Sequence, residues 1–262
     1  MKSVKIREAN ASDKISVLKF CKNTFSWGDY VDHVWDFWLD EGHLFLSEKQ
    51  YPVGICHAFY SKNQVWIEGI RIKSNFRHQK IASELVKHAE TIGRERNVLS
   101  SYMLIDVENF PSLLMANSLN YDVFQTWHFY SLEPKFDTHY DVQFEKSLNL
   151  QFYSHYVKSW RWLSIDDDML LSFNEQNSIV KSGIGDKKSL AILTASDHFD
   201  RTLIVTLFSN FNDSTLQILS FLQNYSMENN YERIQILTKE KLPIFDSLKY
   251  NISFNLMKKS LV

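Results

Sequence analysis

The alternation of apolar and polar residues divides the first half of the chain into short strands and helices. Residues 4–7 alternate with a period of two, as a half-buried strand does. Apolar residues then recur at helical spacing between Ile15 and Cys21, directly after capping residues at 10–13. By the same criteria we expect a helix over 32–39, strands over 44–47, 53–60 and 65–72, a helix over 81–96, a strand over 98–107, a short helix from Pro111 and a strand over 121–132. This order predicts a mixed α/β fold in which a helical crossover follows an antiparallel meander.

The second half of the chain repeats part of this pattern. Residues 104–111 and 118–121 have an echo in 236–243 and 247–250, and both copies are interpreted as a strand, a helix that begins at Glu-x-x-Pro and a second strand. Coincidence in a short match is the alternative to an internal duplication. Strands are also expected over 151–165, 190–194 and 202–208, and helices over 166–181 and 214–227. The predicted organisation is a domain over 1–132, a linker over 133–150 and a smaller α/β lobe over 151–262.

Glycine is scarce, and this excludes several kinds of nucleotide site. The chain of 262 residues has seven glycines, where average usage of roughly 7% would give about 18. The sequence contains no G-x-G-x-x-G for a dinucleotide fold, no P-loop motif and no G-x-S-x-G nucleophile elbow. A phosphate site in this protein must therefore be built with little glycine.

Charge and cysteine content narrow the class of protein further. The formal net charge is −2 with no long run of Lys or Arg, so no nucleic-acid partner is expected. The first residues are charged rather than apolar, and no apolar run approaches the ~18 residues of a membrane span. Cys21 and Cys56 are too few for a disulfide framework or a thiolate metal site. The acidic triplet at 166–168 is interpreted as the start of a helix. We therefore expect a cytoplasmic protein with no membrane partner and no bound metal.

The stretch 66–85 carries the clearest chemistry. A strand is expected to end at Ile72, and a helix to begin after a short loop. The unpaired N–H groups and the positive dipole end of a helix N-terminus attract anions. Cations at that end oppose the dipole by a few tenths of a kcal/mol each, so their presence favours an anion bound there; a solvated polar turn is the alternative. The polar residues concerned are Arg77, His78, Gln79 and Lys80.

This stretch resembles the acetyl-CoA signature of the GCN5-related N-acetyltransferases (GNAT), a strand followed by Arg-x-x-Gly-x-Gly/Ala and an amphipathic helix. The signature reads Arg77-His78-Gln79-Lys80-Ile81-Ala82 after the strand Ile70-Arg71-Ile72. The resemblance covers 4–130 and includes Asn109 after the fifth expected strand. It implies a mixed, mostly antiparallel sheet flanked by helices, with acetyl-CoA as cofactor. The cofactor contacts that it implies are made by Ile70, Arg71, Ile72, Arg77, His78, Gln79, Lys80, Ile81, Ala82, Ser83 and Asn109, the last of which either contacts the pantetheine or steadies its loop.

The resemblance also implies a reaction, the direct attack of an amine on the acetyl thioester, which requires a base. Glu68 stands where related enzymes have a carboxylate that binds or deprotonates the amine; an ion pair with Arg71 or another cation is the alternative. Strict alternation places Glu68 on the same side as Trp66 and Ile70, and a bulge at Gly69 is expected to re-aim it. Trp27, Asp29 and Tyr30 lie where the family forms its acceptor pocket, and aromatic rings with a carboxylate suit a cationic amine; core packing is the alternative.

Two positions depart from the family pattern. Lys80 replaces the usual glycine of the phosphate loop, and Ala116 replaces a tyrosine that supplies the thiolate proton in many relatives. Water, Ser118 or another tyrosine would have to supply that proton. The expected function is acetyl transfer to a small amine that is amino acid-like or aminoglycoside-like, and the alternative is a non-catalytic acyl-CoA-binding or regulatory module. The second lobe has neither Arg nor Gly at 210–215 and is interpreted as a degenerate GNAT-like lobe without cofactor.

Overall fold

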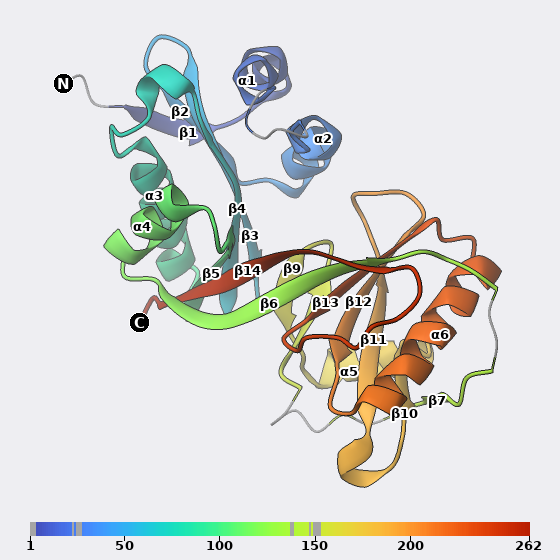
Figure 1. Cartoon of the computed structure of the whole chain (residues 1–262). Coiled ribbons are helices and arrows are strands. Elements are labelled where there is room, and N and C mark those ends of the chain that lie inside the picture. Colours follow the sequence, from blue (N-terminus) through green and yellow to red (C-terminus); the bar gives the residue numbers. More distant parts are fainter. Residues whose placement is uncertain (1–3, 23, 25–27, 137–138, 147, 149–152) are drawn as a thin grey trace. The chain divides into compact units, whose positions relative to one another are not determined.

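The computed structural model of the chain describes residues 4–262 except 23, 25–27, 137–138, 147 and 149–152. It divides into two compact units (Figure 1). The first contains Met1–Phe124 and Asn255–Val262, and the second contains Gln125–Phe254. Each unit has its own sheet and core, so each is described separately.

The first unit is built on an antiparallel meander with a crossover (Figure 1). Its strands lie in the order β1, β2, β3, β4, β5 and then the end of β14. The first four are antiparallel neighbours, whereas β5 runs parallel to β4 after the crossover through α3. The elements are β1 (Lys5–Glu8), η1 (Ala11–Asp13), α1 (Lys14–Cys21), α2 (Val31–Glu41), β2 (Leu44–Glu48), β3 (Pro52–Ser61), β4 (Gln64–Ile72), η2 (Ser74–Phe76), α3 (Ile81–Glu95), β5 (Ser100–Asp106), α4 (Phe110–Ser118), β6 (Asp122–Leu132) and β14 (Leu248–Ser260).

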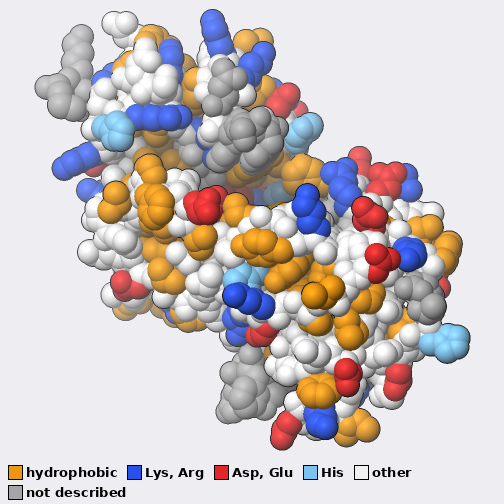
Figure 2. All heavy atoms as spheres, in the orientation of Figure 1, with side chains coloured by type: hydrophobic (Ala, Val, Ile, Leu, Met, Phe, Trp, Pro, Cys, Tyr) orange, Lys and Arg blue, Asp and Glu red, His pale blue; other side chains and the backbone are white. Residues whose placement is uncertain are grey.

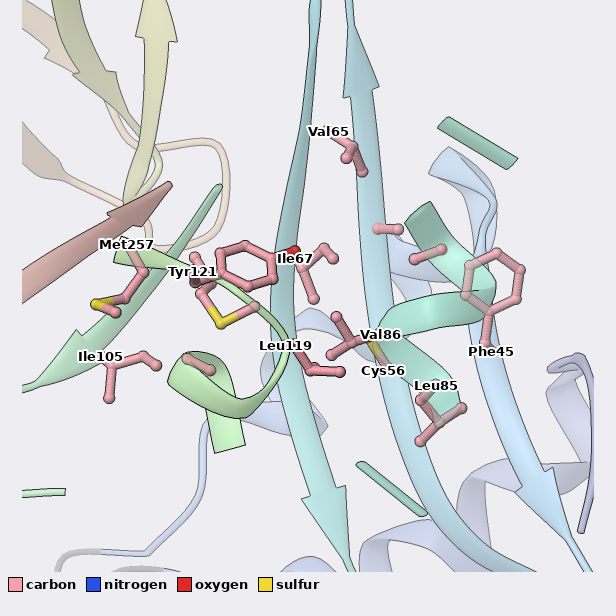
Figure 3. Packing of buried hydrophobic residues seen from close by; sticks show 14 of the residues in the cluster. Phe45, Cys56, Val65, Ile67, Leu85, Val86, Ile105, Leu119, Tyr121 and Met257 are labelled. Atoms are coloured by element: carbon pink, nitrogen blue, oxygen red, sulfur yellow. The ribbon is translucent and has the colours of Figure 1, made fainter. Parts of the chain in front are cut away.

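Helices cover both faces of this sheet, and each face has a separate core. The apolar stripe of α3, including Leu85 and Val86, packs on one face together with α4 (Figure 3). Met257 of β14 belongs to the same cluster. On the other face, α1 and α2 pack Val17 and Trp35 against strand residues of β2 and β3. The expected mixed sheet flanked by helices is confirmed.

A bulge interrupts β4 at the predicted place. Arg71 pairs with Ile55 and Glu68 with His57, so three steps along β4 oppose two steps along β3. Gly69 has a φ of +65° there, the conformation that a glycine adopts in many bulges. Glu68 stays on the side of Trp66, contrary to expectation. The bulge instead reverses the facing of the residues after it, so Ile70 and Ile72 pack on the α3 face.

The second unit repeats this order of elements. Three antiparallel strands, β10, β11 and β12, lead into α6 and then into β13, which is parallel to β12. The sheet order is β6, β13, β12, β11, β10, β7, and β8 and β9 form a separate hairpin. This is the order that an internal duplication predicts. The elements are β7 (Gln143–Phe144), β8 (His155–Lys158), β9 (Arg161–Ser164), α5 (Asp167–Glu175), β10 (Ile179–Ser182), η3 (Gly185–Lys187), β11 (Ser189–Ala195), β12 (Thr202–Phe208), α6 (Asn212–Glu228) and β13 (Arg233–Thr238).

Three elements of the second half differ from expectation. The strand expected over 151–165 is the β8–β9 hairpin, because Ser159 and Trp160 turn the chain with positive φ. The helix expected over 166–181 ends at Glu175, and the residues after it form β10. No helix follows β13, although the echo predicted one. Asn109 caps α4 in the first copy, whereas the matching residue is Lys241, whose ammonium cannot accept a hydrogen bond from a helix N–H.

The boundaries between the units also differ from those expected. The range 133–150, expected to be a linker, contains β7, which pairs with β10. The sheet of the second unit includes the end of β6, and residues 255–262 belong to the first unit. Every described helix is too short or too polar to cross a membrane. On the face in Figure 2, acidic and basic side chains are interspersed, in line with the small net charge.

Candidate functional site

The N-terminus of α3 presents unpaired backbone donors. Lys80 is its N-cap residue, and no side chain caps the helix. Glu84 N donates to Lys80 O at 3.0 Å, so the amides of the first three helical residues have no acceptor within the helix. The exposed side chains of Arg77, His78 and Lys80 lie at this end. The fold thus places a helix N-terminus where the sequence predicted an anion site, with Ile81, Ala82 and Ser83 as its first helical residues, and anion binding there stays a prediction.

The loop before α3 takes its shape without glycine. His78 has a φ of +60° and Lys80 a φ of +61°, both in the left-handed region. The side chain of Gln79 stabilises the loop through two hydrogen bonds. It accepts one from Lys49 Nζ at 3.1 Å and donates one to Asn75 O at 3.3 Å. The family glycine at position 80 therefore corresponds to a backbone conformation that a lysine adopts here at a conformational cost.

The two parallel strands beside this loop separate. Pairing of β4 with β5 extends only over Gln64, Val65 and Trp66 among the described residues. Beyond that point the edge of β4 is open to another extended chain, as in strand addition. In this structure Ile70 O accepts from Arg71 Nη1 at 3.1 Å, and Ile72 O accepts from Arg77 Nε at 3.3 Å. Two arginines of the chain thus donate hydrogen bonds to the carbonyl oxygens that, according to the resemblance, would pair with pantetheine.

Asn109 lies at the start of α4 and has a structural role there. Its Oδ1 accepts from Ser112 N at 3.3 Å, which caps the helix. Ala116, seven residues on, is completely buried in the core of the α3 face. The hydroxyl of Ser118 donates to Met115 O at 2.7 Å. This arrangement corresponds to the loop-steadying alternative for Asn109.

Glu68 lies on the opposite face of β4 in a buried hydrogen-bonded chain. Its Oε1 is 2.9 Å from His57 Nδ1, and its Oε2 accepts from Trp66 Nε1 at 3.2 Å. His57 has no exposed surface. Its Nε2 is 3.1 Å from Gly42 O and 3.4 Å from Glu41 Oε2. A carboxylate, an imidazole and a second carboxylate are therefore connected in series.

These three side chains also satisfy a distance criterion for a metal site, since each offers a ligand atom within 4.8 Å of the others. However, Glu68 and Glu41 contact opposite nitrogens of the ring. The lone pairs of Nδ1 and Nε2 point away from each other, so one ion cannot be bound by the imidazole and both carboxylates in this arrangement. The geometry is that of a hydrogen-bond chain.

Asp29 and Arg71 form a buried ion pair next to Glu68. Arg71 Nε and Nη2 donate to the two carboxylate oxygens at 2.7 and 3.1 Å. The guanidinium carbon lies 5.1 Å from the centre of the Tyr30 ring, and burial raises the pKa of the Tyr30 hydroxyl. The Arg71 side chain thus lies on the Glu68 face as the partner of Asp29, whereas the resemblance had placed Arg71 among the cofactor contacts. Trp27 lies outside the described residues.

The two cysteines are unsuited to nucleophilic chemistry. Both are buried, and burial raises the pKa of the Cys21 thiol to about 12 and that of Cys56 further. A thiol with such a pKa is almost entirely un-ionised at neutral pH, and the thiolate is the reactive form. Neither cysteine is therefore suited to carry an acetyl group as a thioester.

Most of the predicted residues that the structure describes fall into two groups near the β4 bulge. The loop at residues 77–80 and the open edge of β4 form one group, and Asp29, Tyr30, Glu68 and Arg71 form the other. The sequence did not identify His57 or Trp38, whose rings stack with 4.9 Å between centres and 8° between planes. The sequence offered one signal for the role of His57. It is a histidine within a strand expected to be buried, and the next strand has a carboxylate near its centre.

Comparison with known proteins finds a family match within the first unit. The model of the acetyltransferase (GNAT) family matches residues 13–121. No curated protein matches the sequence of this chain.

A protein from Thermoplasma acidophilum, assigned as an acetyltransferase, is similar to this chain in structure. Its TM-score is 0.66 over 98% of this chain and 99% of the other, at 12% identity. A GCN5-related N-acetyltransferase from Sphaerobacter thermophilus has a TM-score of 0.61 over 100% and 96%, at 9% identity. At these identities the likeness concerns the fold, which extends over both units. Residues 13–121, which lie within the first unit, therefore match the GNAT family model, and the similarity in fold extends over the whole chain.

Proposed function

We propose that the first unit transfers the acetyl group of acetyl-CoA to the amine of a small molecule. The observation that carries this proposal is the bulge at Gly69, next to which the open edge of β4 and the Glu68 carboxylate lie on one strand. A thioester on the open edge and an amine beside Glu68 would meet at this point. Acetyl-CoA is the acetyl donor expected of a domain of this family.

In this proposal the cofactor is held at two places. The pyrophosphate binds the amides at the start of α3, assisted by the guanidinium of Arg77 and the ammonium of Lys80. The pantetheine arm pairs with the backbone of Ile70 and Ile72 on the open edge. Arg71 Nη1 and Arg77 Nε now donate to those carbonyls, so they would exchange partners when the arm binds.

The acceptor side supplies a carboxylate and aromatic rings. Glu68 binds the ammonium form of the substrate and removes a proton from it, and the rings of Tyr30 and Trp38 favour a cation. The amine nitrogen then bonds to the acetyl carbon, the carbon–sulfur bond breaks, the nitrogen gives its second proton to water, and coenzyme A leaves as a thiolate. Because Ala116 has no proton to give, the thiolate takes one from water. The charge of the site favours an amino acid-like or aminoglycoside-like amine.

The test is thiol release from acetyl-CoA in the presence of amino acids, polyamines and aminoglycosides. We expect release with at least one amine, and we expect Glu68→Gln to lower kcat about 100-fold or more with little change in acetyl-CoA affinity. If calorimetry shows acetyl-CoA binding but no amine on the panel turns over, the protein is instead a non-catalytic acyl-CoA-binding module.

The cofactor side is tested separately with Arg77→Ala, which removes one charge-assisted contact to phosphate. The Kd for acetyl-CoA should rise about tenfold, the equivalent of ~1.4 kcal/mol. Arg94→Ala, at the other end of α3, is the matched control and should leave this Kd unchanged. Equal affinities of both variants and the parent chain would refute the position of the phosphate site.

A further inference from the structure

The imidazole of His57 connects Glu68 to the end of α2, and the reaction proposed above does not use it. His57 lies on β3, is completely buried, and makes a polar contact through each ring nitrogen. A buried polar side chain between two carboxylates is costly to retain unless its contacts are specific. Its role can be worked out from the atoms that face each nitrogen.

The proton on Nε2 is fixed by its neighbours. Gly42 O at 3.1 Å and Glu41 Oε2 at 3.4 Å are both acceptors, so Nε2 must carry the hydrogen. On the other side, Nδ1 lies 2.9 Å from Glu68 Oε1. A lone pair on Nδ1 facing a carboxylate oxygen would be repulsive, so this contact contains one proton. The ring can therefore hold Glu68 only in this orientation, with Nδ1 toward β4 and Nε2 toward α2.

The plane of the ring is fixed by Trp38. The indole stacks on the imidazole with 8° between the planes, and the same indole fills the space beside Gly69, where any Cβ would overlap it. Trp66 Nε1 donates to the second oxygen of Glu68 at 3.2 Å. The orientation of the Glu68 carboxylate is thus determined by one ring from β3 and one from β4, and α2 holds the first of them.

We propose that His57 is a positioning residue for Glu68: its Nδ1 holds the carboxylate in the orientation that receives the amine, and its Nε2 anchors the ring to the end of α2. This inference rests on the proposed role of Glu68. It predicts that the contact at Nδ1 matters for turnover and that the contact at Nε2 matters much less.

Two amide substitutions separate these contacts. The amide nitrogen of asparagine is bonded to Cγ, as Nδ1 of histidine is, so His57→Asn keeps a donor toward Glu68. The amide nitrogen of glutamine lies one atom further out, near the position of Nε2, so His57→Gln keeps the donor toward Gly42. Both variants are neutral and lose the stacked ring. A merely structural role therefore predicts equal effects on activity, and a positioning role predicts a difference.

We expect His57→Asn to retain kcat within about fivefold and His57→Gln to lose about 10–100-fold, the range that misplacement by about 1 Å can produce. The KM for acetyl-CoA should be unchanged in both, and thermal unfolding should confirm that both fold. In a Glu68→Gln background, His57→Gln should cause no further loss, because the carboxylate that it positions is gone. Equal kcat values for the two His57 variants, or additive losses in the double variant, would overturn the inference. If Glu68→Gln alone retains full activity, the proposed role of Glu68 fails instead.

Discussion

At the scale of single residues, scarce glycine is compensated by other residues in the left-handed conformation. The chain has seven glycines, and positive φ occurs at many non-glycine residues, among them Asn97, Asn120, His78 and Lys80. Asparagine tolerates this conformation because its side chain bonds locally, but lysine has no such compensation. The sequence identifies Lys80 as a departure from the glycine of the family pattern. The positive φ of this residue is a conformation that glycine adopts without steric cost.

Lys80→Gly should therefore stabilise the protein. A left-handed L-residue loses about 1–2 kcal/mol, whereas glycine loses about 0.5–1 kcal/mol of backbone entropy, so we expect a gain of roughly 0.5–1 kcal/mol in the free energy of unfolding. Lys87→Gly, at an exposed position within the same helix, should instead lose about 1 kcal/mol. Urea unfolding of the two variants measures both signs, and a loss of stability in both would contradict the strain at position 80.

At Gly69 the need for glycine is both conformational and steric. Its φ is +65°, and a Cβ would overlap the ring of Trp38. We expect Gly69→Ala to lower the free energy of unfolding by about 2–4 kcal/mol, the sum of backbone strain and overpacking. Gly42 has a φ of +85° and a ψ of 174° with open space around it, so Gly42→Ala should lose only the strain, about 1–3 kcal/mol. Denaturant unfolding compares them, and equal losses would show that Trp38 moves aside without cost.

At the scale of elements, a strong hydrophobic periodicity was sufficient to predict helices and strands. The similarity between the two copies of the repeated stretch was not sufficient. The helix over 81–96 and the strands of the meander follow from their own residues. The helix expected after β13 does not form: Lys241 stands where Asn109 caps α4 in the first copy, and the second copy is three residues shorter. The bulge in β4 could be predicted from Gly69, but the pairing of His57 with Glu68 could not, since the register across β3 and β4 depends on where the extra residue is accommodated.

The short connection between β1 and α1 gives an element-scale prediction about pH. Asp13 accepts from Arg7 Nη1 and Nη2, both at 2.8 Å, and from Asn10 N at 3.0 Å. These bonds, chiefly those from Arg7, lower the pKa of the Asp13 carboxyl. A folded-state pKa below the unfolded value of about 3.9 means that this stabilisation is present above about pH 4 and is lost as pH falls through the folded-state pKa.

Asp13→Asn should accordingly lose about 1–2 kcal/mol at pH 7, and the difference from the parent chain should shrink toward zero as pH falls through the folded-state pKa of Asp13. Asp32→Asn is the control, since Asp32 is exposed and lies 3.7 Å from Lys14; it should change stability by about 0.5 kcal/mol or less. Urea unfolding at several pH values is the measurement. A difference for Asp13→Asn that persists unchanged at low pH would exclude the charge as its source.

At the scale of the whole molecule, the chain is not divided where its sequence pattern changes. Residues 255–262 complete the first unit, where Met257 is fully buried and Leu261 N donates to Leu99 O at 2.9 Å. Lys259 Nζ also donates to the buried Glu90 at 2.7 Å. Periodicity reports which face of an element is buried but not which distant element covers it, so the sequence placed these residues in the second lobe. A domain that ended at residue 132 would lack this strand.

The first unit should therefore depend on the C-terminal strand for its stability. Truncating Met257 removes a side chain from the core that holds α3, so Met257→Ala should lower the free energy of unfolding by about 2–4 kcal/mol and weaken acetyl-CoA binding at temperatures where the first unit begins to unfold. Val262→Ala is the control, because Val262 is 93% exposed and should change stability by less than about 0.5 kcal/mol. A fragment of residues 1–132 should not unfold cooperatively, since it exposes the core surface that Met257 and Leu261 cover. Cooperative unfolding of that fragment with the stability of the full chain would show that the domain is complete without the C-terminal strand.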